Sequence, residues 1–121
     1  MNAQDKDKIE QIIRDRSWAH QAFLDKGSGT YRAFTEVQKV TFSDGALGKL
    51  TKELIATAIS VVTNCESCME WHIHQALLAG ASEKQVLEAI DVGMEMGGGP
   101  ATVSARFALK ALEYHQSSRS G

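Results

Sequence analysis

Residues 46–79 read ALGKLTKELIATAISVVTNCESCMEWHIHQALLA and predict two helices joined by a short turn. The first, 46–62, is apolar on nearly every side, which is typical of a helix at the centre of its domain. Asn64 is predicted to cap the second helix, 65–79, which Gly80 would end. This pair decides the fold, because other helices must pack around it.

Apolar residues recur every three or four positions on both sides of this pair, which predicts further helices. Their expected ranges are 5–26, 30–40, 82–96 and 100–115. We therefore expect an all-α, single-domain bundle of about six helices spanning residues 1–121, with 117–121 as a disordered tail.

Composition excludes several classes of function. The formal net charge is −2, and no basic cluster interleaved with aromatic residues occurs, which argues against nucleic acid as a partner. No apolar run approaches the roughly 20 residues that a membrane span needs. The polar start of the chain does not resemble a signal peptide, so we expect a cytoplasmic protein without a membrane partner.

The only two cysteines, Cys65 and Cys68, lie one helical turn apart, and His72 follows one turn later. At about 100° per residue, the three side chains fall within about 60° of one another on a helix. Two thiols beside an imidazole are the minimum equipment for reversible dithiol–disulfide chemistry. In a reducing compartment such a pair is more often catalytic or metal-binding than a structural crosslink.

A line of polar residues on the helix 46–62 and the turn after it adds a carboxylate to this group. The line consists of Glu53, Thr57, Ser60 and Asn64. If the two helices fold back on each other, Glu53 lies within about one 5.4 Å turn of His72. His74 is as close in height but lies on the other side of its helix, so the register predicts a contact between Glu53 and His72.

These positions predict a redox reaction. Cys65 in the first helical turn favours a thiolate, and Cys68 lies within proton-transfer reach of His72, which Glu53 would orient. A thiolate that attacks a peroxide becomes a sulfenic acid, which the other cysteine resolves as a disulfide. An external dithiol would then restore the thiols.

The spacing from Glu53 through Cys65-x-x-Cys68 to His72 resembles the signature of the alkylhydroperoxidase D-like, carboxymuconolactone decarboxylase superfamily. The similarity continues through 79–82 and 97–101 and covers about 30–112. It implies an all-α fold, homo-oligomers (trimers or hexamers), and a cofactor-free, metal-free peroxidase that a dithiol or protein thiol reduces. It also implies that Cys68 meets the hydroperoxide and Cys65 closes the disulfide, while His72 and Glu53 relay protons.

One position departs from that family pattern. Ser67 stands where many members carry a second histidine, so a shorter proton relay is expected here. The decarboxylase branch typically lacks the cysteine pair, so Cys65 and Cys68 argue against lactone decarboxylation.

The same residues fit other interpretations. The cysteines could be small buried apolar residues, or Cys65, Cys68, His72 and Glu53 could bind a metal. The chain could also be a non-enzymatic redox-sensing oligomer, or a decarboxylase-like enzyme acting on an organic acid. Glu70 is interpreted as a solvated charge, and His74 and His115 as surface groups.

Overall fold

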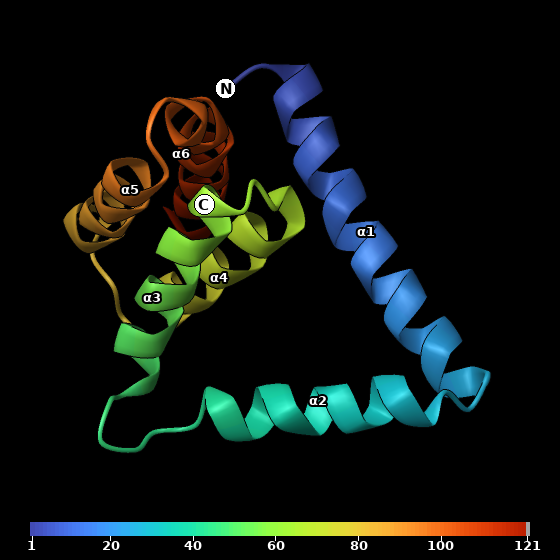
Figure 1. Cartoon of the computed structure of the whole chain (residues 1–121). Coiled ribbons are helices and arrows are strands. Elements are labelled where there is room, and N and C mark those ends of the chain that lie inside the picture. The colour runs from blue at the N-terminus through green and yellow to red at the C-terminus, as the bar shows by residue number, and fades with distance from the viewer. Residues whose placement is uncertain (121) are drawn as a thin grey trace.

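The chain forms six helices and no strand in the computed structural model, which describes residues 1–120 (Figure 1). The helices are α1 (Ala3–Asp25), α2 (Gly29–Thr41), α3 (Lys49–Val62), α4 (Glu66–Leu78), α5 (Glu83–Gly97) and α6 (Gly99–Ser120). The all-α prediction is therefore confirmed. Within the described residues, no helix is long and apolar enough to cross a membrane.

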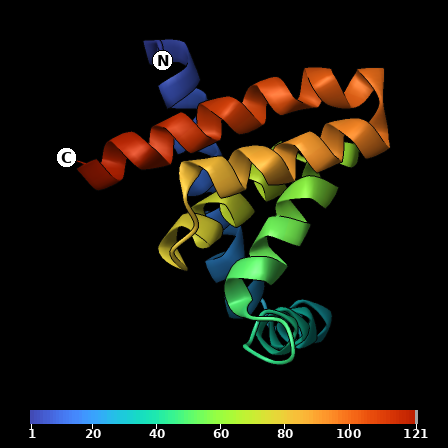
Figure 2. The same ribbon diagram turned by 90° about the vertical axis from the view of Figure 1, so that its left-hand side faces the viewer.

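Helices α3 to α6 form the bundle, and α1 and α2 form an arm beside it. α3 packs against α4 and α5, and both of these pack against α6. α5 and α6 run side by side in opposite directions (Figure 2). α1 contacts α4 and α6, whereas α2 makes close backbone contact with α1 alone among the described helices.

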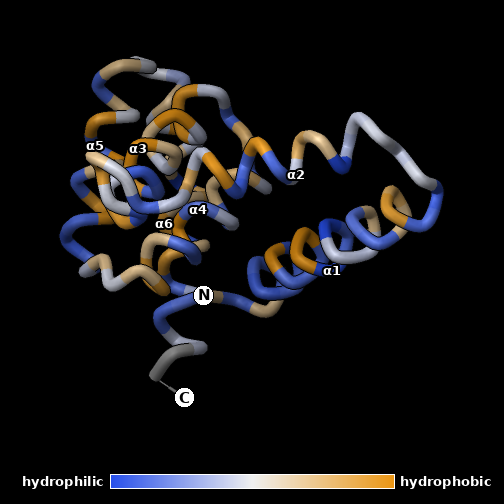
Figure 3. The backbone as a smooth tube through the Cα atoms, turned by 90° about the horizontal axis from the view of Figure 1, so that it is seen from below, coloured by the Kyte–Doolittle hydropathy of each residue, from blue (hydrophilic) through white to orange (hydrophobic). Residues whose placement is uncertain are grey.

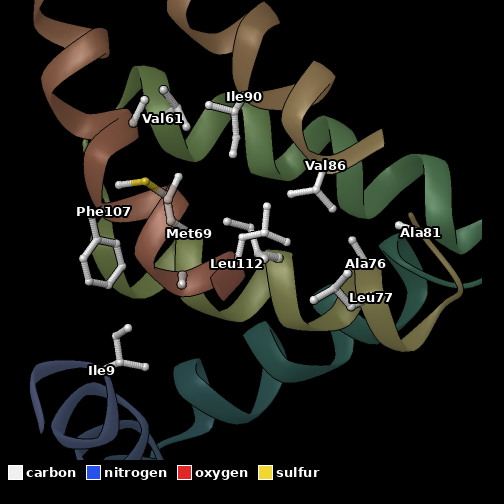
Figure 4. Close-up of a cluster of buried hydrophobic side chains, with 14 of the residues drawn as sticks. Ile9, Val61, Met69, Ala76, Leu77, Ala81, Val86, Ile90, Phe107 and Leu112 are labelled. Carbon is white, nitrogen blue, oxygen red and sulfur yellow. The ribbon is translucent and has the colours of Figure 1, made fainter. Parts of the chain in front are cut away.

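The core lies between the four bundle helices and is closed on one side by α1. Val61 of α3, Met69 and Ile73 of α4, Ile90 of α5 and Ala108 of α6 are each at most 2% exposed. Ile9 of α1 reaches the same cluster (Figure 4). Burying each large apolar side chain contributes about 1.5–3 kcal/mol, so this layer holds α3 and α4 in a fixed register.

α3 packs against the three other bundle helices, as its apolar sequence indicated, but part of its apolar surface stays uncovered in the single chain. Its buried face carries Glu53, Thr57, Ser60 and Val61. Ile55 and Ile59 point away from that face and are 45% and 56% exposed. The tube coloured by hydropathy shows further apolar stretches on the α1–α2 arm (Figure 3).

The turn between α3 and α4 differs from the predicted cap. Asn64 adopts the left-handed backbone conformation with φ 53°, which asparagine tolerates better than most residues. Cys65 is consequently the N-cap of α4, and its Sγ accepts a hydrogen bond from the Cys68 amide at 3.2 Å. The Asn64 side chain instead accepts a hydrogen bond from Ser104 of α6.

The last helix is longer than predicted. It was expected to end near residue 115, but α6 continues to Ser120 and includes most of the segment that we expected to be a disordered tail. Ser118 donates a hydrogen bond to the Tyr114 carbonyl within this extension. Gly121 lies outside the described residues.

Glu70 is a buried charge and not a solvated one. Its side chain is 1% exposed and joins three helices. One carboxylate oxygen lies 2.5 Å from Arg16 Nη2 of α1, and the other lies 2.6 Å from His115 Nε2 of α6. His115 is itself only 4% exposed, so its expected place at the surface is also wrong.

Burial alone would raise the pKa of Glu70, but the contacts with His115 and Arg16 outweigh it and hold this pKa below its usual value. The carboxylate is therefore ionised in the folded protein at neutral pH. It ties the arm to the bundle through two partners that lie far away in the sequence.

Gly93 allows α3 and α5 to approach closely. A Cβ atom at this position would lie 2.8 Å from the Ala58 carbonyl oxygen and 2.9 Å from Val61 Cβ. We predict that Gly93→Ala lowers the free energy of unfolding by about 1–3 kcal/mol, as overpacking of a tight contact does. Chemical denaturation would measure the change, and an equally stable variant would contradict the close packing.

Acid should weaken the fold through Glu70. The pKa of Glu70 in the folded protein lies below the ordinary value of 4.5. The stabilisation that ionised Glu70 gives the fold is therefore fully present above pH 4.5 and is lost as pH falls through the folded pKa. Glu70→Gln should cost about 3 kcal/mol at pH 7, the lower end for a broken buried ion pair, since Arg16 stays partly exposed. It should also flatten the acid dependence measured by denaturation, whereas parallel curves would contradict the assignment.

Candidate functional site

Glu53 projects from α3 toward α4 and is almost fully buried, with 2% of its side chain exposed. Its Oε1 lies 2.7 Å from His72 Nδ1, and its Oε2 lies 2.6 Å from Lys49 Nζ. The contact between Glu53 and His72 is the one that the register of the two helices predicted. Lys49 was not anticipated, although its position four residues before Glu53 on one helix is a recognisable signal.

These contacts determine the charge of Glu53. Burial alone would raise the pKa of Glu53, but its hydrogen bonds with His72 and Lys49 outweigh that effect and lower the pKa. An ionised Glu53 accepts from Nδ1, which leaves Nε2 of a neutral His72 ring free to take a proton. Phe42 stacks on this imidazole with ring centroids 5.2 Å apart and limits its rotation.

The rest of the predicted polar line does not join this group. Thr57 and Ser60 are buried, but their hydroxyls donate to the carbonyls of Glu53 and Ala56 in their own helix. Asn64 is exposed. Glu53 is therefore the one member of the line whose side chain reaches His72.

Cys65 and Cys68 are joined by a disulfide, with Cα atoms 5.2 Å apart. The Cys65 amide donates to the Ser60 carbonyl at 3.0 Å, which fixes the pair at the start of α4 against the end of α3. Both cysteines are partly exposed and lie outside the apolar core, so they are not the small buried apolar residues of the alternative interpretation.

An open cavity of about 590 Å³ lies between α1, α2 and α4. Its walls include Cys68 and His72 but not Cys65. The other lining residues are Arg16, Ser17, His20, Tyr31, Thr35, Gln38, Ser67 and Trp71. A molecule in this cavity would meet the Cys68 side of the disulfide together with the imidazole.

None of the α1 residues of the cavity was predicted as a site residue from the sequence. Arg16 Nη2 donates to the Ser67 carbonyl at 2.9 Å and to Ser67 Oγ at 3.1 Å. His20 Nδ1 and the Tyr31 hydroxyl lie 2.7 Å apart across the α1–α2 junction. Helix periodicity alone could not reveal these contacts, because they depend on how the arm folds back on the bundle.

A second group of metal-ligand side chains lies away from the cysteines, between α4 and α6. Ligand atoms of Glu70, His74 and His115 all lie within 4.8 Å of one another. The two imidazoles, however, are stacked 4.0 Å apart and nearly parallel, at 4°. Ring nitrogens bind metals in the plane of the ring, so parallel rings do not converge on one ion without rotating. The metal site that the sequence left open, at Cys65, Cys68, His72 and Glu53, offers no thiolate ligand while the two cysteines form a disulfide.

Comparison with known proteins places these features in a family. Residues 29–111 match the model of the carboxymuconolactone decarboxylase family. An uncharacterized protein encoded in the cox locus of Paracoccus denitrificans is 45% identical over 87 residues, covering 72% of this chain and 78% of its own length. An uncharacterized protein of Cupriavidus necator is 43% identical over 82 residues, covering 68% and 70%.

Two solved structures share the fold. A carboxymuconolactone decarboxylase family protein from Legionella pneumophila is 32% identical, with a TM-score of 0.79 over 92% of this chain and 96% of the other. A Thermotoga maritima member, whose part in an antioxidative response is described as a possibility, is 24% identical, with a TM-score of 0.83 over 91% and 93%. The chain thus belongs to the carboxymuconolactone decarboxylase family.

Proposed function

We propose that this protein is a cofactor-free thiol peroxidase, an antioxidant enzyme that reduces hydroperoxides through Cys65 and Cys68. The observation that carries the proposal is the hydrogen bond between Glu53 and His72, whose imidazole lines the same cavity as Cys68. A structural crosslink has no need for an oriented base beside it. Membership of the family supports the proposal, and the Thermotoga member supports the fold alone.

In the oxidative half-reaction, His72 Nε2 takes the proton of the Cys68 thiol. The Cys68 thiolate attacks one peroxide oxygen, so that an S–O bond forms while the O–O bond breaks. The leaving oxygen receives the proton from His72 and departs as an alcohol or water. The Cys65 thiolate then attacks the Cys68 sulfenic acid, forms the disulfide and releases hydroxide, which is protonated to water.

In the reductive half-reaction, a small dithiol or a protein thiol returns two electrons to the disulfide. Because Cys68 lines the cavity and Cys65 does not, the reductant would enter from the same side as the peroxide. Because Ser67 stands where many family members carry a second histidine, the proton relay is expected to consist of His72 and Glu53 alone. In this proposal the enzyme acts in the cytoplasm.

The proposal includes assembly into homo-oligomers, trimers or hexamers. Its support is the exposed apolar surface of α2 and α3. On α2, Phe34 and Val37 are 61% and 56% exposed in the single chain. Apolar side chains gathered on one face of an amphipathic helix are typical of subunit contacts. The same surface favours one alternative, a redox-sensing oligomer without turnover.

We predict that Cys68→Ser abolishes peroxide consumption, because it removes the sulfur that meets the substrate. His72→Ala should slow turnover about 100-fold, as loss of a positioned general base does, and Glu53→Ala should slow it less. Consumption of hydrogen peroxide and of an organic hydroperoxide would be followed with excess dithiothreitol. Glu95→Ala, on the exposed surface of α5, is the matched control.

Full peroxide consumption by the Cys68→Ser variant would refute the proposal that this protein is a thiol peroxidase. Activity on an organic acid that survives loss of both cysteines would favour the decarboxylase-like alternative. Stoichiometric zinc in protein purified without chelator would favour the metal site.

Sizing of the reduced and oxidised protein separates the enzyme from the sensor. The peroxidase should keep one assembly state through its cycle, because turnover needs both redox forms to bind substrates in the same cavity. A change of assembly without peroxide consumption would support the sensor instead.

A further inference from the structure

The peptide group between Ser67 and Cys68 is held at both ends. Its N–H donates to Cys65 Sγ at 3.2 Å, and its carbonyl accepts from Arg16 Nη2 at 2.9 Å. A cation at the carbonyl polarises the peptide and strengthens the hydrogen bond on its N–H side. One peptide group thus connects the Arg16 guanidinium to the Cys65 sulfur without a direct contact between the two.

Arg16 reaches this position from outside the region that the family model covers, since α1 precedes residue 29. The guanidinium also lies 5.2 Å from the Trp71 ring, and its side chain is 27% exposed. The Glu70 carboxylate, 2.5 Å from Nη2, anchors the cation and offsets part of its field. The arm thus delivers one positive charge to the first turn of α4.

Other charged groups surround the same turn. Glu66 follows Cys65 directly, and Lys8 of α1 neutralises it at 2.9 Å. Further charged or titratable groups on the helices packed here are Lys49 and Glu53 of α3, Glu70 and His72 of α4, and Arg106 and His115 of α6. Of the cations around this turn, Arg16 is the one that contacts the peptide whose N–H donates to the Cys65 sulfur.

We propose that Arg16 is a positioning residue that stabilises the Cys65 thiolate through the Ser67–Cys68 peptide and thereby makes the disulfide easier to reduce. The inference rests on the proposed function for its place in a catalytic cycle. The effect on the disulfide itself can be measured without any peroxide.

The step that Arg16 assists is the first thiol–disulfide exchange. A thiolate of the external dithiol attacks Cys68 Sγ from the cavity, and a new S–S bond forms to that sulfur. The Cys65–Cys68 bond breaks, and its electron pair leaves on Cys65 Sγ, where α4 and the polarised Cys68 N–H stabilise the charge. The second thiol of the reductant then displaces Cys68, which leaves the dithiol oxidised and both protein cysteines reduced.

The test is the equilibrium of the purified protein with dithiothreitol redox buffers, read by trapping of free thiols. Arg16→Gln should lower the equilibrium constant for reduction about fivefold, or roughly 20 mV toward more negative potential. Arg16→Lys keeps the charge and should restore at least half of that shift. Arg14→Gln, on an exposed part of the same helix, is the control and should leave the equilibrium unchanged.

Glu70→Gln separates an electrostatic role from a structural one. Removal of the negative charge beside Arg16 should make the disulfide easier to reduce, the opposite direction to Arg16→Gln. If Arg16 merely fastens α1 to α4, loss of either partner should shift the equilibrium in the same direction. An unchanged equilibrium in Arg16→Gln, or two shifts of the same sign, overturns the proposal.

If Arg16→Gln does not fold, the Glu70→Gln variant alone tests the proposal. A disulfide that is easier to reduce in this variant supports the role of Arg16, and one that is harder to reduce overturns it. A failed peroxidase assay with an intact Arg16 effect would disprove the proposed function and leave this inference standing.

Discussion

The burial of a carboxylate on α3 is the constraint on which the rest of the site depends. An ionised group removed from water is costly unless charged or hydrogen-bonding partners replace the lost hydration. Glu53 meets this requirement with Lys49 from its own helix and His72 from the next one. The requirement fixes the orientation of the imidazole, and the imidazole in turn lies on the wall of the cavity that exposes Cys68.

The same physical rule operates a second time on α4. Glu70 faces away from Glu53 and is neutralised by Arg16 and His115. The first carboxylate organises the base beside the disulfide, whereas the second draws α1 across the start of α4. Together they join the arm, the bundle and the disulfide turn, and they add to the apolar contacts of α1, where Ile9 is buried and Ile12 and Ile13 pack against the core partly buried.

The sequence predicted those features that depend on neighbouring segments. The contact between Glu53 and His72 follows from helical period and one short turn, so it could be located before the structure was known. The partners of Glu70 come from α1 and α6, and no local pattern indicates which distant helices will meet. Asparagine is a favoured N-cap residue, but Asn64 adopts a left-handed conformation in the turn, and Cys65 is the N-cap of α4 instead. The apolar face of α2 could be recognised, yet periodicity does not say whether the same chain covers it.

The central claim is that the two cysteines form a redox pair that a hydroperoxide oxidises. Its most direct test is a single turnover, in which fully reduced protein is mixed with one equivalent of hydroperoxide and no reductant. The account predicts that each chain consumes one peroxide and forms the Cys65–Cys68 disulfide, detected by mass spectrometry as the loss of two hydrogens. Persistent peroxide beside two free thiols would contradict it.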